Sequence, residues 1–162
     1  ALKARHPEVW VSVSATTRPP RPTEVDGVHY HFVSNADFDV LVATDGLLEW
    51  ATVHGRDRYG TPSAPVEAAV ERGERVILEI DLQGARQVRQ RLPGARLVFI
   101  APPNWAELVN RLVGRGTETA EQRERRLRTA QVELAAADEF DHVVVNDDLG
   151  RAVDDLVSLL GL

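Results

Sequence analysis

The stretch VILEIDLQGARQVRQRLPGARLVFIAPPNWAELVNRLVGR (residues 76–115) alternates continuous apolar runs with segments of helical pattern. The runs at 76–80 and 96–100 indicate strands, and a helix-forming segment follows each of them. An apolar run with a single acid inside it is typical of a strand buried on both faces. Strands that alternate with helices predict an α/β fold with a parallel sheet flanked by helices.

The same alternation continues on both sides of this stretch. Before it, we expect the end of a helix at 1–10, strands at 11–13, 28–33 and 47–53, and irregular loops at 16–27 and 55–62. We also expect a helix at 65–72 and one at 35–45, with Asn35 or Ser34 as its cap and Gly46 just past its end. After it, we expect a helix at 120–137, a strand at 142–146 and a helix at 147–160. The segment 28–53 is rich in strands with short connections, which favours an inserted antiparallel lobe.

Length and composition favour one soluble globular domain. The chain has 162 residues, of which 43% are hydrophobic and 27% charged, and this is enough to bury a sizeable core. The formal net charge of −6 argues against broad nucleic-acid binding. Cysteine is absent, so disulfides are excluded, and no apolar run has transmembrane length. We expect a cytoplasmic protein without a membrane partner; the oligomeric state stays open.

A Pro-rich loop carries two arginines directly after a predicted buried strand. Arg18 and Arg21 offer planar guanidinium groups that suit phosphate oxygens, and the prolines restrict the loop without using hydrogen-bond donors. Glu24 can hold one arginine in place, and Tyr30 can add a hydroxyl donor to the same phosphate. The alternative is a solvated basic loop, because exposed arginine is common.

A carboxylate stands inside an apolar strand in LLEWATV (residues 47–53). Glu49 is costly to bury there unless it has a partner, and a carboxylate can accept from both the N1–H and the N2 amine of guanine. The O6 and N7 acceptors of guanine would suit Ser14, Thr61 or an arginine. Alternatively, Glu49 lies on the wet face of an edge strand, and Tyr59 is a packing aromatic.

Two acids close the predicted strand at 76–80. Ligands of open α/β sheets bind at the carboxyl ends of strands, where Glu79 and Asp81 fall. An acid at this place commonly orders Mg²⁺ beside nucleotide phosphates, directly or through water. The alternative is a carboxylate that only caps a helix or a loop.

A hinged, Arg-rich segment follows at 110–131. Arg111 and Arg115 are four residues apart and share a helical face, while Gly114 and Gly116 loosen the join to the next helix. Such a segment suits a lid that brings cations to a transferring phosphoryl group as water leaves. It would equally suit a solvated helix face.

Taken in order, these segments resemble the guanylate kinase family over essentially the whole chain. The resemblance rests on SVSATTRPPRPTEVDGVHYHF (12–32), LLEWATVHG (47–55), YGTP (59–62), LEIDLQGA (78–85), VFIAPP (98–103), RLVGRGTET (111–119) and VVVND (143–147). It implies the P-loop nucleoside monophosphate kinase fold, with a central parallel sheet flanked by helices, an inserted mixed α/β lobe and a helical lid. The implied division is core 1–14, GMP-binding lobe 15–73, core 74–113, lid 114–128 and core 129–162.

The resemblance also implies roles for individual residues. GMP phosphate would be bound by Arg18, Arg21, Tyr30 and Tyr59, with Glu24 orienting an arginine, and guanine would be read by Glu49, Ser14 and Thr61. Glu79 and Asp81 match acids near GMP and Mg²⁺, with Asp81 holding the metal through water. Arg115 and Arg126 resemble lid arginines that reach the transferring phosphoryl group, Arg111 would face ATP, and Asn146 would lie on the adenine side of ATP.

Two features depart from the family pattern. The Gly-rich GxxxxGK[ST] loop that cradles ATP phosphates does not occur in these 162 residues, so we expect it upstream and expect this stretch alone to be inactive or weak. Arg58 stands where many relatives carry an aromatic residue.

From the resemblance as a whole we expect Mg²⁺-dependent phosphoryl transfer from ATP to GMP. A non-catalytic scaffold module that binds phosphopeptides is the alternative, and Glu49 disfavours a kinase for another monophosphate.

Overall fold

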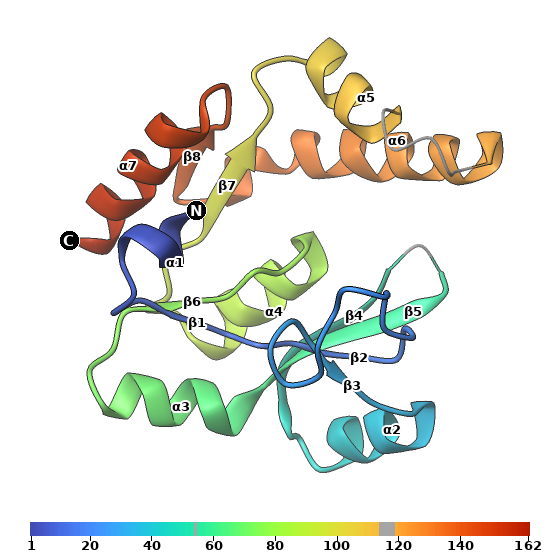
Figure 1. The fold of residues 1–162 in the computed structure, drawn as a ribbon, viewed down its shortest axis with the longest axis vertical. Helices are drawn as coiled ribbons and strands as arrows, with labels where there is room; N and C mark the ends of the chain where they lie inside the picture. Colours follow the sequence, from blue (N-terminus) through green and yellow to red (C-terminus); the bar gives the residue numbers. More distant parts are fainter. Residues whose placement is uncertain (54, 114–118) are drawn as a thin grey trace. The chain divides into compact units, whose positions relative to one another are not determined.

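The computed structural model describes residues 1–53, 55–113 and 119–162 (Figure 1). The chain divides into two compact units, one formed by Lys3–Ala95 and the other by Arg96–Leu162 together with Ala1–Leu2. A short helix, α1 (Leu2–Arg5), begins the chain. Within the described ranges, no helix is both long and apolar enough to cross a membrane.

A four-stranded mixed sheet forms the centre of the unit Lys3–Ala95. Its strand order is β3-β2-β5-β4, where the pair β2/β3 is parallel and the pairs β2/β5 and β5/β4 are antiparallel. The strands are β2 (Ala15–Thr16), β3 (His31–Phe32), β4 (Leu47–Val53) and β5 (Asp57–Pro62). β4 is thus an edge strand of this sheet. The sheet in the segment expected to form an antiparallel lobe is therefore mixed, with one parallel pair among antiparallel ones.

Helix α2 (Asn35–Ala43) covers one face of this sheet (Figure 1). Of the two predicted caps, Ser34 is the one used, because its hydroxyl accepts from the Asp37 N–H at 3.1 Å. Phe38 is fully buried and packs with Ala15 and Leu47 into a hydrophobic cluster. This cluster fixes the helix on the sheet by removing apolar surface from water.

The pair β1 (Trp10–Val11) and β6 (Val76–Ile77) forms a separate two-stranded parallel sheet in the same unit. Helix α3 (Ser63–Glu71) leads from the lobe toward β6, and helix α4 (Leu82–Arg91) follows it. Asp81 caps α4 by accepting from the Gly84 N–H at 2.8 Å. Helix α4 packs against strand β4, as its side-chain hydrogen bonds to Leu47 and Trp50 show.

The other unit contains a two-stranded parallel sheet and three α-helices among its described residues. The strands are β7 (Val98–Ala101) and β8 (His142–Val145), and the helices are α5 (Trp105–Val113), α6 (Ala120–Ala135) and α7 (Leu149–Leu160). A short 3₁₀ turn, Ala137–Glu139, links α6 to β8. Phe99 of β7 packs edge-on against Phe140, which precedes β8.

Three sequence predictions about strands differ from the structure. The segment GRDRYGTP, expected to be an irregular loop, contains strand β5, because it pairs with β2 on one side and β4 on the other. The strand expected at 76–80 is assigned only over Val76–Ile77 and is half-buried, since it pairs only with β1 within the described ranges. The expected strand at 28–33 is likewise shortened to β3.

Candidate functional site

An ion pair organises the Pro-rich loop that follows β2. Glu24 accepts two hydrogen bonds of 2.9 Å from the guanidinium of Arg18, in the bidentate geometry that favours this pairing. Both side chains are largely shielded from solvent, at 13% exposed for Arg18 and 10% for Glu24. The hydrogen bonds from Arg18 lower the pKa of Glu24 to about 2, and the same pairing raises the pKa of Arg18. The expected orienting role of Glu24 thus has the right geometry.

Two tyrosines converge on the same arginine. The Arg18 Nε–H donates to the Tyr59 hydroxyl at 3.1 Å, and the Arg18 guanidinium lies 5.4 Å from the centre of the Tyr30 ring. The rings of Tyr30 and Tyr59 meet edge to face at 5.8 Å. Because the Tyr59 oxygen accepts from Arg18, its own proton is directed toward another acceptor.

Arg21 contributes positive charge from the exposed side of the loop. Its backbone N–H donates to Glu24 at 2.7 Å, while its guanidinium lies 3.7 Å from Glu24 and is 66% exposed. Arg18 is therefore held in place, whereas Arg21 can reach for a ligand. The structure brings together the four residues expected to bind phosphate and the acid expected to orient an arginine: Arg18, Arg21, Tyr30 and Tyr59, with Glu24.

A buried carboxylate with one hydroxyl partner lies farther along the sheet. Glu49 is only 5% exposed, and the Thr61 hydroxyl donates to its Oε1 at 2.6 Å. Burial raises the pKa of Glu49, and the nearby charge of Asp81 adds to this effect, against the opposing hydrogen bond from Thr61. The alternative of a solvent-exposed Glu49 on an edge strand is wrong. Strand β4 does lie at an edge of its sheet, but helix α4 covers the Glu49 carboxylate there.

Strand register places the Glu49 carboxylate and the Tyr59 side chain on one face of the four-stranded sheet. Across the β4/β5 pair, Glu49 lies opposite Thr61 and Ala51 lies opposite Tyr59. Residues opposite each other, and those two apart on one strand, share a face, so Glu49, Thr61 and Tyr59 point the same way. Tyr59 and Thr61 are then roughly 7 Å apart along the strand. The β2/β5 pair adds Thr16 to this face, which we call the site face.

Arg58 lies on the opposite face, next to helix α2. Its guanidinium stacks 4.6 Å from the centre of the Phe38 ring and donates to Asp39 at 2.6 Å. It also donates to the backbone and side-chain oxygens of Asn35. The departure from the family pattern at this position is therefore accommodated by a cation–π contact and an ion pair, away from the site face.

The acids expected to close a strand follow β6, which ends at Ile77, and Asp81 is near enough to Glu49 for its charge to affect that carboxylate. Asp81 Oδ1 accepts from the Gly84 N–H at 2.8 Å and so caps helix α4, as the alternative interpretation of this acid expected. Glu79 is exposed two residues earlier. Hard oxygen donors of this kind suit Mg²⁺, which retains several of its waters. No group of three or more His, Asp or Glu side chains forms a candidate metal cage in the described ranges.

The remaining predicted residues have the following positions. Ser14 is half-buried, lies one residue before β2, and accepts from the His31 N–H through its carbonyl. Arg111 of α5 donates to Glu107, Arg126 is half-buried on α6, and Asn146 follows β8 and donates its backbone N–H to Ala101. These last three belong to the unit Arg96–Leu162. Arg115 lies outside the described residues.

Sequence reasoning missed several polar residues that support the site. The hydroxyls of Thr16 and Thr17 bind the backbone of Arg58, which ties the arginine-bearing loop to β5. The Gln87 side chain on α4 binds both backbone groups of Trp50. Threonine and glutamine are common surface residues, so only the run of hydroxyls before Arg18 could have signalled such a role.

Known proteins resemble this chain over nearly its whole length. The profile of the guanylate kinase family matches residues 2–161. A guanylate kinase of Cutibacterium acnes is 63% identical over 162 residues, which are 100% of this chain and 81% of that protein. One from Thermobifida fusca is 58% identical over 159 residues, covering 98% of this chain and 81% of the relative.

The chain belongs to the guanylate kinase family. The crystal structure of guanylate kinase from Anaplasma phagocytophilum superposes with a TM-score of 0.82 at 30% identity, covering 99% of this chain and 79% of that one. The expected α/β fold, the family resemblance and the assignment to a family of phosphotransferases are therefore confirmed. The alternative of a non-catalytic scaffold module is not favoured, since the relatives named above are guanylate kinases.

Proposed function

We propose that this member of the guanylate kinase family binds GMP on its site face and transfers the γ-phosphoryl group of ATP to it, giving ADP and GDP. The observation that carries the proposal is the register of β4 and β5, by which the buried Glu49 shares a face with Tyr59, the residue that accepts a hydrogen bond from Arg18. One ligand with a phosphate at one end and paired donors at the other would meet both groups.

The monophosphate would be bound by the loop side of the site face. Four of the five N–H groups of Arg18 are engaged, by Tyr59, Pro19 and both oxygens of Glu24, which leaves one N–H and the charge for a ligand. The Tyr59 and Tyr30 hydroxyls and the exposed Arg21 would complete the phosphate site. Arg18 would thus serve mainly to orient the other donors, because its own guanidinium is held in place.

Guanine would be selected by Glu49. An ionised carboxylate can accept from N1–H and from the N2 amine together, and the Thr61 hydrogen bond orients it for this. Adenine would place its N1 acceptor against the same carboxylate and be repelled. Ser14 is proposed to serve the acceptor atoms of the base, whereas the single hydroxyl proton of Thr61 is engaged by Glu49, so Thr61 would act on the base through that carboxylate.

The other groups are proposed from their residue types and positions. Asp81, with Glu79 nearby, would hold Mg²⁺ through water, and the metal would neutralise phosphate charge when bound. Arg111, Arg115, Arg126 and Asn146 are proposed to act on the ATP side. With substrates such as ATP and GMP, the protein would act in purine nucleotide metabolism in the cytoplasm.

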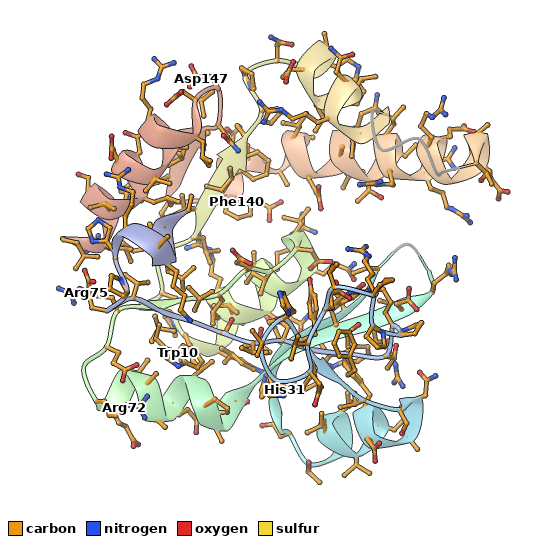
Figure 2. All side chains as sticks on the ribbon, in the orientation of Figure 1. Trp10, His31, Arg72, Arg75, Phe140 and Asp147 are labelled. Carbon is orange, nitrogen blue, oxygen red and sulfur yellow. The ribbon has the colours of Figure 1, made fainter. Side chains whose placement is uncertain are left out.

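Calorimetric titration with GMP, AMP, CMP and UMP tests the proposal. GMP should bind most tightly, and equal binding of AMP would refute the guanine assignment. Arg18→Ala should weaken GMP by roughly 10- to 150-fold, the loss of one charge-assisted hydrogen bond, while guanosine changes little. Arg75→Ala serves as the control, because Arg75 is exposed outside the site face (Figure 2). Equal losses for GMP and guanosine would show that Arg18 does not bind phosphate.

A further inference from the structure

We propose that Gln87 is a positioning residue through which helix α4 holds Glu49 in place and so sets the selectivity for the base. The proposal deepens the proposed function and rests on Glu49 reading guanine. It is carried by a pair of hydrogen bonds from α4 to the strand beside Glu49, and by the absence of a side chain at Gly84, where α4 approaches the carboxylate.

Gln87 binds the backbone immediately after Glu49. Its Oε1 accepts from the Trp50 N–H at 3.1 Å, and its Nε2 donates to the Trp50 carbonyl at 2.7 Å. Trp50 lies on β4, an edge strand of the four-stranded sheet, so the amide satisfies both groups as a neighbouring strand would. The peptide that joins Glu49 to Trp50 is thereby fixed on its open side.

Arg91 repeats this attachment one turn later on α4. Its guanidinium donates to the Leu47 carbonyl at 2.9 Å and to Asp45 at 2.7 Å. Residues four apart lie on the same helix face, so Gln87 and Arg91 form one line of contact along the edge of β4. Glu49 lies between the two attachment points in the sequence.

Gly84 lets the first turn of the helix approach the carboxylate itself. A Cβ at this position would overlap Glu49 Oε2 and lie 3.0 Å from Glu49 Cδ and 3.2 Å from the Ile80 Cβ. Helix α4 therefore packs directly against Glu49 Oε2 at Gly84, while the Thr61 hydroxyl donates to Oε1 at 2.6 Å. Any shift of α4 along or away from β4 would move the carboxylate relative to the base.

A purely structural role for Gln87 makes a different prediction. If the amide only fastened the helix to the sheet, its loss would lower the melting temperature and weaken all ligands alike. A positioning role instead acts on the base and leaves the phosphate end of the site unchanged. The ratio of affinities for GMP and IMP separates the two, because inosine keeps N1–H and lacks the N2 amine.

The experiment compares GMP, IMP and ribose 5-phosphate by calorimetry on the folded chain. Gln87→Leu should reduce the GMP-over-IMP preference about tenfold, as expected for a displaced hydrogen bond, and leave ribose 5-phosphate binding unchanged. Gly84→Ala should also reduce it, since the added methyl group displaces the carboxylate. Gln90→Leu, an exposed position on the same helix, is the matched control and should keep the preference.

Glu49→Gln shows whether the proposed function or the further inference has failed. If the wild-type chain does not prefer GMP to IMP, Glu49 does not read the amine and both proposals fall. If Glu49→Gln abolishes the preference while Gln87→Leu and Gly84→Ala keep it, only the positioning role is overturned. Should Gln87→Leu fail to fold, two other variants test the positioning role by the same ratio of affinities for GMP and IMP. They are Gly84→Ala and Gln87→Glu, which retains an acceptor for the Trp50 N–H.

Discussion

Replacing Glu49 by glutamine should change the base that the site prefers. Glutamine has nearly the same volume, and its carbonyl oxygen can still accept from Thr61, so the buried environment is preserved. One carboxylate oxygen, however, becomes an amide nitrogen with two donors. In GMP that nitrogen would face the N2 amine, donor against donor. In XMP it would face a carbonyl acceptor at the same ring position.

The size of the effect follows from the burial of Glu49, which is 5% exposed. A hydrogen bond to a charged group contributes about 1.5–3 kcal/mol, and a buried donor left without a partner costs a further ~1–3 kcal/mol. Taking about 3 kcal/mol for the sum, GMP should bind roughly 150-fold more weakly to Glu49→Gln. XMP should bind the variant better than GMP does.

Calorimetry with GMP and XMP at several pH values provides the assay. Burial raises the pKa of Glu49 above its usual 4.5, and only the ionised form accepts from both guanine donors. Wild-type affinity for GMP should therefore fall as pH is lowered through this raised pKa, at higher pH than for an exposed carboxylate. The variant should lack this dependence. A variant that binds GMP as tightly as wild type, or a wild-type affinity independent of pH, would refute the reasoning.

Two further predictions concern stability. The pKa of Glu24 is about 2 in the folded chain against 4.5 unpaired, so its ion pair with Arg18 stabilises the fold above pH 4.5, and this stabilisation is lost as pH falls from 4.5 toward 2. Glu24→Gln should flatten that part of the curve of unfolding free energy against pH; an unchanged curve would contradict the assignment. Phe38→Ala should lower the unfolding free energy by about 3–5 kcal/mol in denaturant titrations, because a fully buried ring is removed. Val40→Ala, at an exposed position of the same helix, should cost far less, and equal losses would argue against the cluster around Phe38.

Local signals in the sequence predicted most helices well. A cap at Asn35 or Ser34 before an apolar pattern predicted the beginning of α2, and the Ser34 hydroxyl caps the helix in the structure. The strand 47–53 was predicted with the bounds that β4 has. Both signals act between neighbouring residues, through a capping hydrogen bond and through the pattern of apolar side chains.

Strand β5 shows where local reasoning fails. The segment GRDRYGTP contains glycine, proline and aspartate, all of which are depleted in strands, and so it was predicted to be a loop. Pairing on both sides outweighs these preferences. Gly60 is required by that pairing, since an added Cβ would lie 2.9 Å from the Glu49 carbonyl oxygen and from the Trp50 Cβ.

The sequence alone determined which chemical groups this protein has for a nucleotide, and the family to which it belongs. Residue types and motif order are contained in the chain itself, and so is the apolar pattern that forms α2 and β4. Only the tertiary structure decided that Glu49 and Tyr59 share one face, that Tyr59 binds Arg18, and that Gln87 holds the strand beside Glu49. These relations link residues about 10 to 40 positions apart, and strand register and helix packing, which no local preference encodes, bring them together.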